Sequence, residues 1–313
     1  MSRSPLALAA LATVAIPGLD AVDVRRLVHP GTDFDVAVVI DSSRRRWVVR
    51  APGQPAAGAA LEAEVALLER IAEQVDGGYH LPFAVPRPVG FAHLTEGGRA
   101  VVHEEIAGGP LRLDALVPGP GLAASLGRAL AALHELPVEL VESVGLPTYD
   151  AAAYRDRRLA EVDEAARTGK VPPTLLRRWE LLLEDVAIWR FQPTVVHGDL
   201  SAEHVLTDGR EITGLLGWGE AKVADPADDL AWLLVAAPQD AVESVMEAYQ
   251  LARTELTDPH LTDRALLASE LALARWLLYG VRSGSAEVVA DAVQMLAELD
   301  ENTSAAADEA SPA

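Results

Sequence analysis

A carboxylate and two imidazoles lie close together in one short stretch of this chain, at His197, Asp199 and His204. Side chains of these kinds serve as general bases, as proton donors and as metal ligands. Apolar residues frame the stretch on both sides, and the hairpin-turn signal Asp208-Gly209 follows it. We therefore predict a strand–loop–strand that presents Asp199 and His204 on one loop, with the residues after Leu216 beside them.

The elements that must position this loop fall into two groups. The N-terminal part reads as a small antiparallel sheet with one amphipathic helix, with strands at 25–28, 34–40, 46–50, 89–93 and 99–105 and the helix at 60–75. The first three strands form an antiparallel meander. After a glycine-containing break at 106–110, helical periods dominate to about residue 299. The sequence therefore predicts an α+β fold with an N-terminal lobe over residues 1–106, a mainly helical lobe over 107–300 and a disordered tail over 301–313.

Composition limits the partners of the chain. Half of the 313 residues are hydrophobic, which is enough for a sizeable core, and the formal net charge is −21. Such a surface repels a nucleic-acid backbone, so we expect no nucleic-acid partner, whereas a local basic pocket for a single nucleotide is compatible with it. Cysteine is absent, which excludes disulfides and thiolate metal sites and fits a cytoplasmic protein.

The apolar run from Leu6 to Ile16 is too short to span a bilayer, and we expect no membrane partner. Its length matches the core of a secretory signal, but only one cation precedes it. Its Ala-Leu repeats suit an amphipathic helix, which is the interpretation we favour.

The segment from Val195 to Ala231 resembles the catalytic loop of aminoglycoside phosphotransferase-type kinases, which reads H-G-D-x-x-x-x-N followed by I-D-W or D-F-G. It is more similar to the macrolide 2′-phosphotransferase branch, which has His in place of the Asn and a stretch resembling D-W-T-E-A-x-V-x-D-P. Here that stretch reads G-W-G-E-A-K-V-A-D-P, from Gly217 to Pro226. The resemblance covers most of the chain, including L-x-x-L-H at Leu130–His134. It implies a two-lobed protein-kinase-like fold and transfer of the γ-phosphate of GTP or ATP to a hydroxyl of a small molecule, such as a macrolide.

The resemblance also assigns roles to the residues of the loop. Asp199 stands where the family has the base that accepts the proton of the acceptor hydroxyl, and His197 where it has a residue that braces the loop. His204 occupies the position of the amide that holds Mg²⁺. A neutral imidazole suits this ion less well than oxygen does, so orienting Asp199 is the alternative role for His204. Glu220 is a second candidate metal ligand.

For the nucleotide, the resemblance points to the N-terminal lobe. Arg50 ends the third strand at the position of the cation that pairs with phosphate, and Glu64, off the apolar face of the next helix, is its expected partner. A surface cation and a solvated acid are the simpler interpretations of these two residues. Further contacts are expected from the loop at 29–36 and from backbone groups of the hinge at 103–106, through Thr32, Asp33, His103, Glu104 and Ile106.

The chain departs from the family where an Asp should chelate magnesium. It has Gly217 at this position, and glycine offers no side-chain ligand. The loss should cost several kcal/mol of transition-state stabilisation. Three outcomes stay open: Glu220 or Asp225 supplies the carboxylate, the enzyme works slowly with more water on the metal, or the chain binds nucleotide or a small molecule without efficient transfer.

Three further expectations concern the surroundings of the loop. Asp229 should hydrogen-bond the backbone of the catalytic loop. Trp276 and Tyr279, near Arg275, either line an acceptor pocket or belong to the core. The helical lobe should bind the acceptor, and several acids lie in or directly before its predicted helix at 151–168. They either attract an amine-bearing acceptor or are merely solvated; the acids are Asp150, Asp156, Glu161, Asp163 and Glu164.

Overall fold

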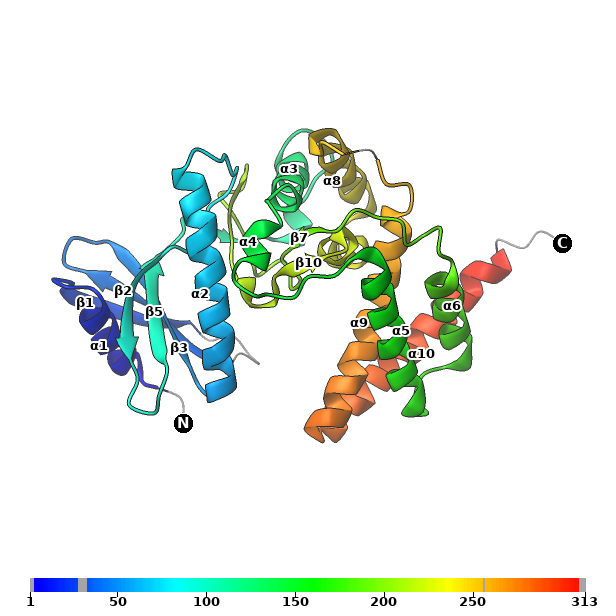
Figure 1. Ribbon diagram of the computed structural model, residues 1–313, viewed down its shortest axis with the longest axis horizontal. Coiled ribbons are helices and arrows are strands. Elements are labelled where there is room, and N and C mark those ends of the chain that lie inside the picture. The colour runs from blue at the N-terminus through cyan, green and yellow to red at the C-terminus, as the bar shows by residue number, and fades with distance from the viewer. Residues whose placement is uncertain (1–2, 28–32, 256, 310–313) are drawn as a thin grey trace.

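The computed structural model describes residues 3–27, 33–255 and 257–309, which form a strand-rich lobe and a larger helical lobe (Figure 1). The N-terminal lobe is a five-stranded antiparallel sheet in the order β1-β2-β3-β5-β4. Its elements are α1 (Pro5–Ala15), β1 (Ala21–Leu27), β2 (Phe34–Asp41), β3 (Arg46–Pro52), α2 (Pro55–Asp76), β4 (Pro88–His93) and β5 (Arg99–Glu104). This confirms the expected antiparallel meander with one long helix.

The two helices of this lobe cover opposite faces of the sheet (Figure 1). Residues two apart on a strand share a face, so Ala37 and Val39 of β2 pack with Leu8 of α1. Leu61 and Val65 of α2 pack on the other face. The apolar run near the N-terminus is thus the amphipathic helix α1. None of the described helices is both long and apolar enough to cross a membrane.

The helical lobe surrounds two small pieces of sheet. Strands β7 (Thr194–Val196) and β10 (Lys222–Ala224) pair antiparallel, as do β6 (Gly109–Pro110), β8 (Val205–Thr207) and β9 (Ile212–Leu215). The hairpin expected at Asp208-Gly209 is confirmed by the β8–β9 pairing. The helices are α3 (Leu122–His134), α4 (Glu139–Glu142), α5 (Ala151–Arg167), α6 (Pro173–Glu184), α7 (Ala231–Ala236), α8 (Gln239–Ala252), α9 (Leu261–Ser283) and α10 (Ala286–Glu309). Short 3₁₀ turns lie at η1 (Leu113–Ala115), η2 (Trp218–Glu220) and η3 (Pro226–Asp229).

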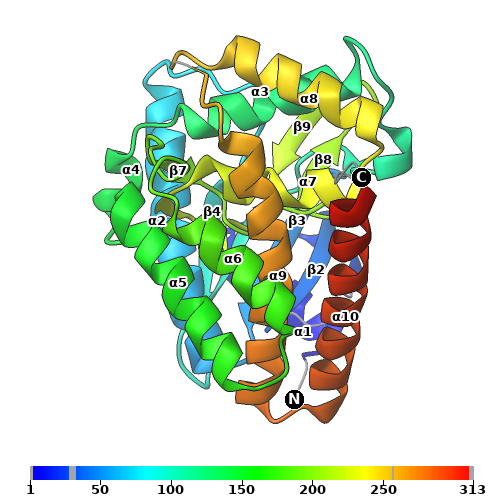
Figure 2. The same cartoon turned by 90° about the vertical axis from the view of Figure 1, so that its right-hand side faces the viewer.

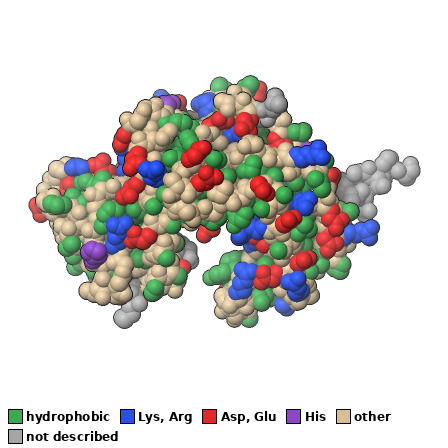
Figure 3. Space-filling model, in the orientation of Figure 1, with side chains coloured by type: hydrophobic (Ala, Val, Ile, Leu, Met, Phe, Trp, Pro, Cys, Tyr) green, Lys and Arg blue, Asp and Glu red, His purple; other side chains and the backbone are tan. Residues whose placement is uncertain are grey.

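Packing joins the lobes through α2. Leu67, Leu68 and Ile71 of this helix belong to the same buried cluster as Leu126 and Leu130 of α3. On the far side of the helical lobe, α5, α6, α9 and α10 pack around a second cluster (Figure 2). The surface is deeply hollowed between the lobe that carries α2 and the lobe that carries α5 and α9 (Figure 3).

The boundaries of two helices differ most from the sequence expectation. Helix α2 begins at Pro55, before the predicted start at residue 60, because proline is favourable in the first turn of a helix and alanines follow it. The tail was expected to lack structure from Glu301 onward, but α10 continues to Glu309. Alanine has the highest helix propensity, and Ala292 and Leu296 anchor this helix in the second cluster, so the helix extends beyond its buried part.

Candidate active site

The His-Gly-Asp turn directly follows β7 and is fixed by one buried carboxylate. The backbone N–H groups of His197 and Gly198 donate to the two oxygens of Asp229, at 2.7 and 2.8 Å. Gly198 has φ +80°, a conformation that glycine adopts without strain. The expected hydrogen bonds from the loop backbone to Asp229 are thus confirmed.

Asp229 is fully buried and receives further support from His134. Nε2 of His134 lies 3.3 Å from Oδ2 of Asp229, and its Nδ1 lies 2.8 Å from the Tyr249 hydroxyl. Burial alone would raise the pKa of Asp229, but the hydrogen bond and charge of His134 and the loop N–H groups more than offset it and lower the pKa. The carboxylate therefore stays ionised behind the turn.

Asp199 itself points toward solvent. Its side chain is 63% exposed, and Nδ1 of His204 lies 3.9 Å from its Oδ2. An exposed carboxyl group at the end of a rigid turn can accept a hydrogen bond from a ligand hydroxyl.

His197 is fully buried and braces the loop. Its Nε2 lies 2.7 Å from the Leu216 carbonyl, and its Nδ1 lies 3.4 Å from the Asp199 N–H. Burial lowers the pKa of His197, so the ring is neutral, with Nε2–H donating and Nδ1 accepting. These contacts support the bracing role that we predict for His197, which stays a prediction.

His204 lies over Gly217. Its Nδ1–H donates to the Asp199 carbonyl at 2.7 Å, which directs Nε2 elsewhere. A Cβ built on Gly217 would lie 2.8 Å from that Nε2, and Gly217 has φ +79°. The space beside residue 217 is therefore occupied by the imidazole.

The structure also locates the two acids that could replace the missing metal ligand. Asp225 is buried and accepts from Nε of Arg264 at 2.6 Å, so it is committed to a structural ion pair. Glu220 is exposed on η2. Of the two, only Glu220 is free to face a ligand.

The residues present do not fit a resident magnesium ion. Among the residues that the structure describes, no three His, Asp or Glu side chains converge as they would around a metal. The atom at the expected coordination position is an imidazole nitrogen of His204, and Mg²⁺ prefers oxygen ligands in near-octahedral geometry. The assignment of His204 and Glu220 as metal ligands stays untested, and this geometry does not favour it.

Across from the loop, the structure joins the predicted pair in the N-terminal lobe. Nη1 of Arg50 donates to Oε1 of Glu64 at 2.6 Å, and Arg50 also lies over the Phe34 ring. We expected Glu64 off the apolar face, but its side chain is only 2% exposed, because the guanidinium compensates its buried charge. Its other oxygen lies 3.9 Å from a Cβ built on Gly219, so the pair faces the segment that follows Gly217.

The remaining nucleotide candidates are only partly placed. Thr32 lies outside the described residues. Asp33 accepts from the Gln54 amide at 2.6 Å. At the end of β5, His103 is buried, its pKa is lowered to about 4 by burial, and its Nδ1–H donates to the Glu104 carbonyl. Its side chain is thus unavailable to a ligand.

The other two hinge candidates lie nearer the surface. The exposed carboxylate of Glu104 pairs with Arg45, in the turn between β2 and β3. Ile106 is half-buried and packs against Gly214. Contacts of this segment with a nucleobase stay a prediction.

Acids of the predicted substrate helices are mostly paired. Glu161 binds Arg157 and Arg158, and Glu164 binds Arg282. Asp150 caps α5, while Asp156 and Asp163 pair with arginines of the same helix. Helix α5 is therefore not a free acidic surface.

One expected aromatic pair and one residue that was not expected remain to be placed. Trp276 and Tyr279 are partly exposed and stack on each other, and Trp276 donates to Asp291 of α10, so they belong to the α9–α10 side rather than to the core. Lys222, at the first of the two variable positions of the family stretch, lies against Gly198. The sequence analysis did not identify Lys222 as a site residue, although a cation within that stretch could have indicated it.

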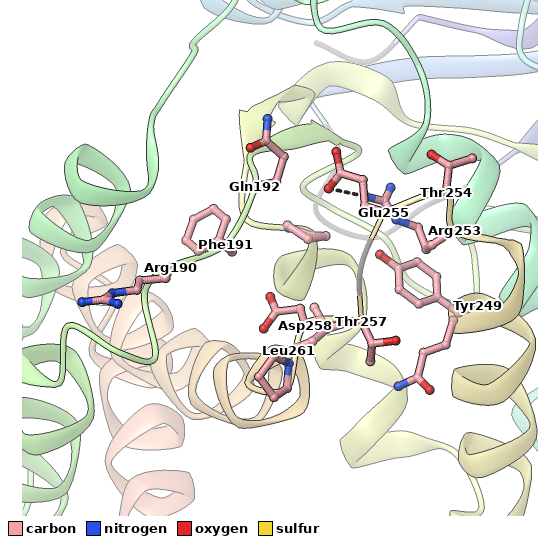
Figure 4. Close-up of a pocket in the computed structure, with 13 residues that line it drawn as sticks. Arg190, Phe191, Gln192, Tyr249, Arg253, Thr254, Glu255, Thr257, Asp258 and Leu261 are labelled. Atoms are coloured by element: carbon pink, nitrogen blue, oxygen red, sulfur yellow. Dashed lines mark hydrogen bonds and ion pairs between the residues drawn. The ribbon is translucent and has the colours of Figure 1, made fainter.

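A separate pocket of about 640 Å³ lies elsewhere in the helical lobe (Figure 4). It lies between the segment before β7 and the α8–α9 connection, with Phe191 on one wall and Tyr249 and Arg253 on the other. Its lining residues do not include His197, Asp199 or His204, and Tyr249 connects it to the His-Gly-Asp turn through His134 and Asp229.

Similar proteins have this arrangement of lobes. The macrolide 2′-phosphotransferase MphH from Brachybacterium faecium superposes with a TM-score of 0.77 at 26% identity, over 93% of this chain and 98% of that one. The GDP complex of aminoglycoside 2′-phosphotransferase-IIIa superposes with a TM-score of 0.77 at 21% identity, over 96% and 100% of the two chains. The uncharacterized protein YcbJ of Bacillus subtilis (strain 168) is 27% identical over 234 residues, which are 72% of this chain and 75% of its own.

These likenesses confirm the expected two-lobed protein-kinase-like fold and the resemblance drawn from the catalytic segment. The profile of the APH phosphotransferase enzyme family matches residues 24–268, which include most of both lobes, the Arg50–Glu64 pair and the His-Gly-Asp turn. This chain belongs to the APH phosphotransferase enzyme family.

Proposed function

We propose that this protein transfers the γ-phosphate of GTP or ATP to a hydroxyl of a small molecule, a macrolide antibiotic or a related natural product. One observation carries the proposal: the Asp199 carboxylate is exposed on a turn that Asp229 holds rigid. The likeness to a macrolide 2′-phosphotransferase supports the choice of acceptor, and the GDP complex of a structural neighbour supports a purine nucleotide.

In this reaction the acceptor oxygen bonds to the γ-phosphorus while the bond from phosphorus to the β–γ bridging oxygen breaks. Asp199 orients the acceptor hydroxyl and takes its proton, and the nucleoside diphosphate leaves. Arg50, held in place by Glu64, neutralises charge on the phosphates from the N-terminal lobe. His197 keeps Asp199 in place, since it joins the turn to the Leu216 carbonyl.

Magnesium enters this proposal with the substrate. A nucleoside triphosphate carries Mg²⁺ on its phosphates, and this ion commonly keeps several waters and few protein ligands. The lack of a carboxylate at Gly217 then lowers the rate without preventing nucleotide binding.

The alternative is a protein that binds nucleotide or a small molecule without efficient transfer. The position of His204 over Gly217 favours it, because an imidazole replaces the carboxylate that the family places there.

One assay separates the two. Purified protein is incubated with Mg²⁺, γ-labelled GTP or ATP and a panel of macrolides, and phosphorylated product is measured by mass spectrometry. Transfer should fall 100-fold or more in Asp199→Asn, on the order of what a general base contributes. The control is Asp20→Asn, an exposed acid before β1. Nucleotide binding without product in the wild type supports the binder, and transfer that survives Asp199→Asn refutes the role of this residue.

A further inference from the structure

A pocket of about 260 Å³ adjoins the catalytic turn on the helical lobe. Its walls come from α5, α9, the loop before α5 and the segment at 219–222, and Gly198 of the turn is part of its lining. A molecule in this pocket therefore lies beside Asp199. If the proposed function holds, this is where the acceptor places the groups that surround its reacting hydroxyl.

Cations outnumber acids in the lining of this pocket. The charged residues are Arg157, Arg158, Lys222 and Arg275 against Glu161, Glu220 and Asp228. Two of the acids are already used within the protein. Glu161 pairs with Arg157 and Arg158, and Asp228 accepts from Arg158 at 2.9 Å and from the Tyr154 hydroxyl. Glu220 remains as an exposed acid at the rim.

Lys222 is the first cation with hydrogen-bonding capacity to spare. As the first residue of β10 it pairs with Val196, and its Nζ packs so tightly against the turn that a Cβ on Gly198 would collide with it. Its contacts are the Glu220 carbonyl at 3.3 Å and the Asp228 carboxylate at 3.9 Å. An ammonium has three donors, so these two long contacts leave it under-used.

Arg275 of α9 is the second cation of the pocket with unused hydrogen-bond donors. Its Nη1 is buried and has no hydrogen-bond partner among the described residues, and the Glu161 carboxylate lies 3.8 Å away. The side chain as a whole is 40% exposed, and its Nη2 makes one long hydrogen bond, to the Ala268 carbonyl at 3.4 Å, so a ligand in the pocket can reach the guanidinium through atoms other than Nη1. Burial and the neighbouring charge of Arg158 lower the pKa of Arg275, as expected for a cation without full compensation.

We propose that Lys222 and Arg275 bind an anionic group of the acceptor, a carboxylate or a phosphate, and so select hydroxylated acids over amines. An anion would supply the charge-assisted hydrogen bonds that both cations lack. A protonated amine in the same place would meet two like charges. This inference rests on the proposed function, and among macrolide-like natural products it favours those with an acidic group near the phosphorylated hydroxyl.

The test compares ligands built on one hexose scaffold. Glucuronate, glucose 6-phosphate, glucose and glucosamine are titrated calorimetrically at low salt, with the nucleotide cleft saturated by GDP or ADP. We expect at least one acid to bind tenfold or more tightly than glucose, and glucosamine to bind more weakly than glucose. The tighter of the two acids identifies a carboxylate or a phosphate as the preferred group. Lys222→Gln and Arg275→Gln should each reduce the preference for the acid about tenfold, and Lys222→Arg should retain most of it.

Arg282→Gln is the matched control, because Arg282 lies on the same helix, pairs with Glu164 and is absent from the pocket. It should leave the preference unchanged. Equal or tighter binding of glucosamine, no binding of either acid, or an unchanged preference in both glutamine variants overturns the inference. Because binding is measured without turnover, a lack of transfer counts against the proposed function alone, whereas efficient transfer to an amine counts against this inference alone.

Discussion

The contact between Gly217 and His204 can be measured as a coupling energy. A methyl group at residue 217 would lie 2.8, 2.9 and 3.1 Å from three atoms of the His204 ring, at a backbone φ of +79°. The positive φ costs an alanine about 1–2 kcal/mol. Crowding adds about 1–3 kcal/mol, since the ring must move away and weaken its hydrogen bond to the Asp199 carbonyl. Gly217→Ala should therefore lower the free energy of unfolding by about 2–5 kcal/mol.

The assay is a double-mutant cycle in urea. His204→Ala removes the ring, so that Gly217→Ala in this background should cost only the φ contribution, and the coupling should be about 1–3 kcal/mol. Gly209→Ala is the matched control, because Gly209 has φ +90° and no atom within 4 Å of a built Cβ. It should cost about 1–2 kcal/mol with no coupling to His204. A coupling below about 0.5 kcal/mol for Gly217 would show that the ring does not occupy this space.

Two further predictions concern buried charge. Arg50→Met should lower the free energy of unfolding by about 3–5 kcal/mol, because Glu64 is left buried and unpaired. The control is Arg99→Met, which should cost less than about 1 kcal/mol because its partner Glu62 is exposed. Urea unfolding measures both variants. His103 has a pKa of about 4 when folded and an ordinary value of 6.5, so its stabilising effect is complete above pH 6.5 and is lost as the pH falls toward 4. Lowering the pH from 7 to 5 should therefore reduce the free energy of unfolding by about 2 kcal/mol through His103. In His103→Leu the free energy of unfolding, measured in urea at several pH values, should depend less on pH.

Local signals were sufficient for the catalytic segment. The β8–β9 hairpin follows from a turn dipeptide between apolar runs, and the role of Asp229 follows from a short side chain placed where loop N–H groups need acceptors. Such features depend on a few neighbouring residues. They can therefore be predicted without knowing the rest of the fold.

Features that depend on tertiary contacts were harder to predict. Glu64 looks like a solvated acid on the helical wheel, and only the approach of Arg50 from β3 explains its burial. The pocket beside the turn joins α5, β10 and α9, which are far apart in sequence. No spacing rule places Lys222 and Arg275 in one cavity.

The acids of α5 show why total charge is a poor guide to the acceptor. The chain carries a net charge of −21, and counting acids on this helix suggests a site for an amine. In the structure Glu161 is shared by Arg157 and Arg158 and comes near Arg275, so it orients cations rather than facing a ligand. A ligand in the pocket meets the donors that remain exposed after such internal pairing, and here these belong to Lys222 and to the exposed part of the Arg275 guanidinium. The local balance of unused hydrogen-bonding groups, more than the sum of charges, therefore determines which acceptor this protein can hold beside Asp199.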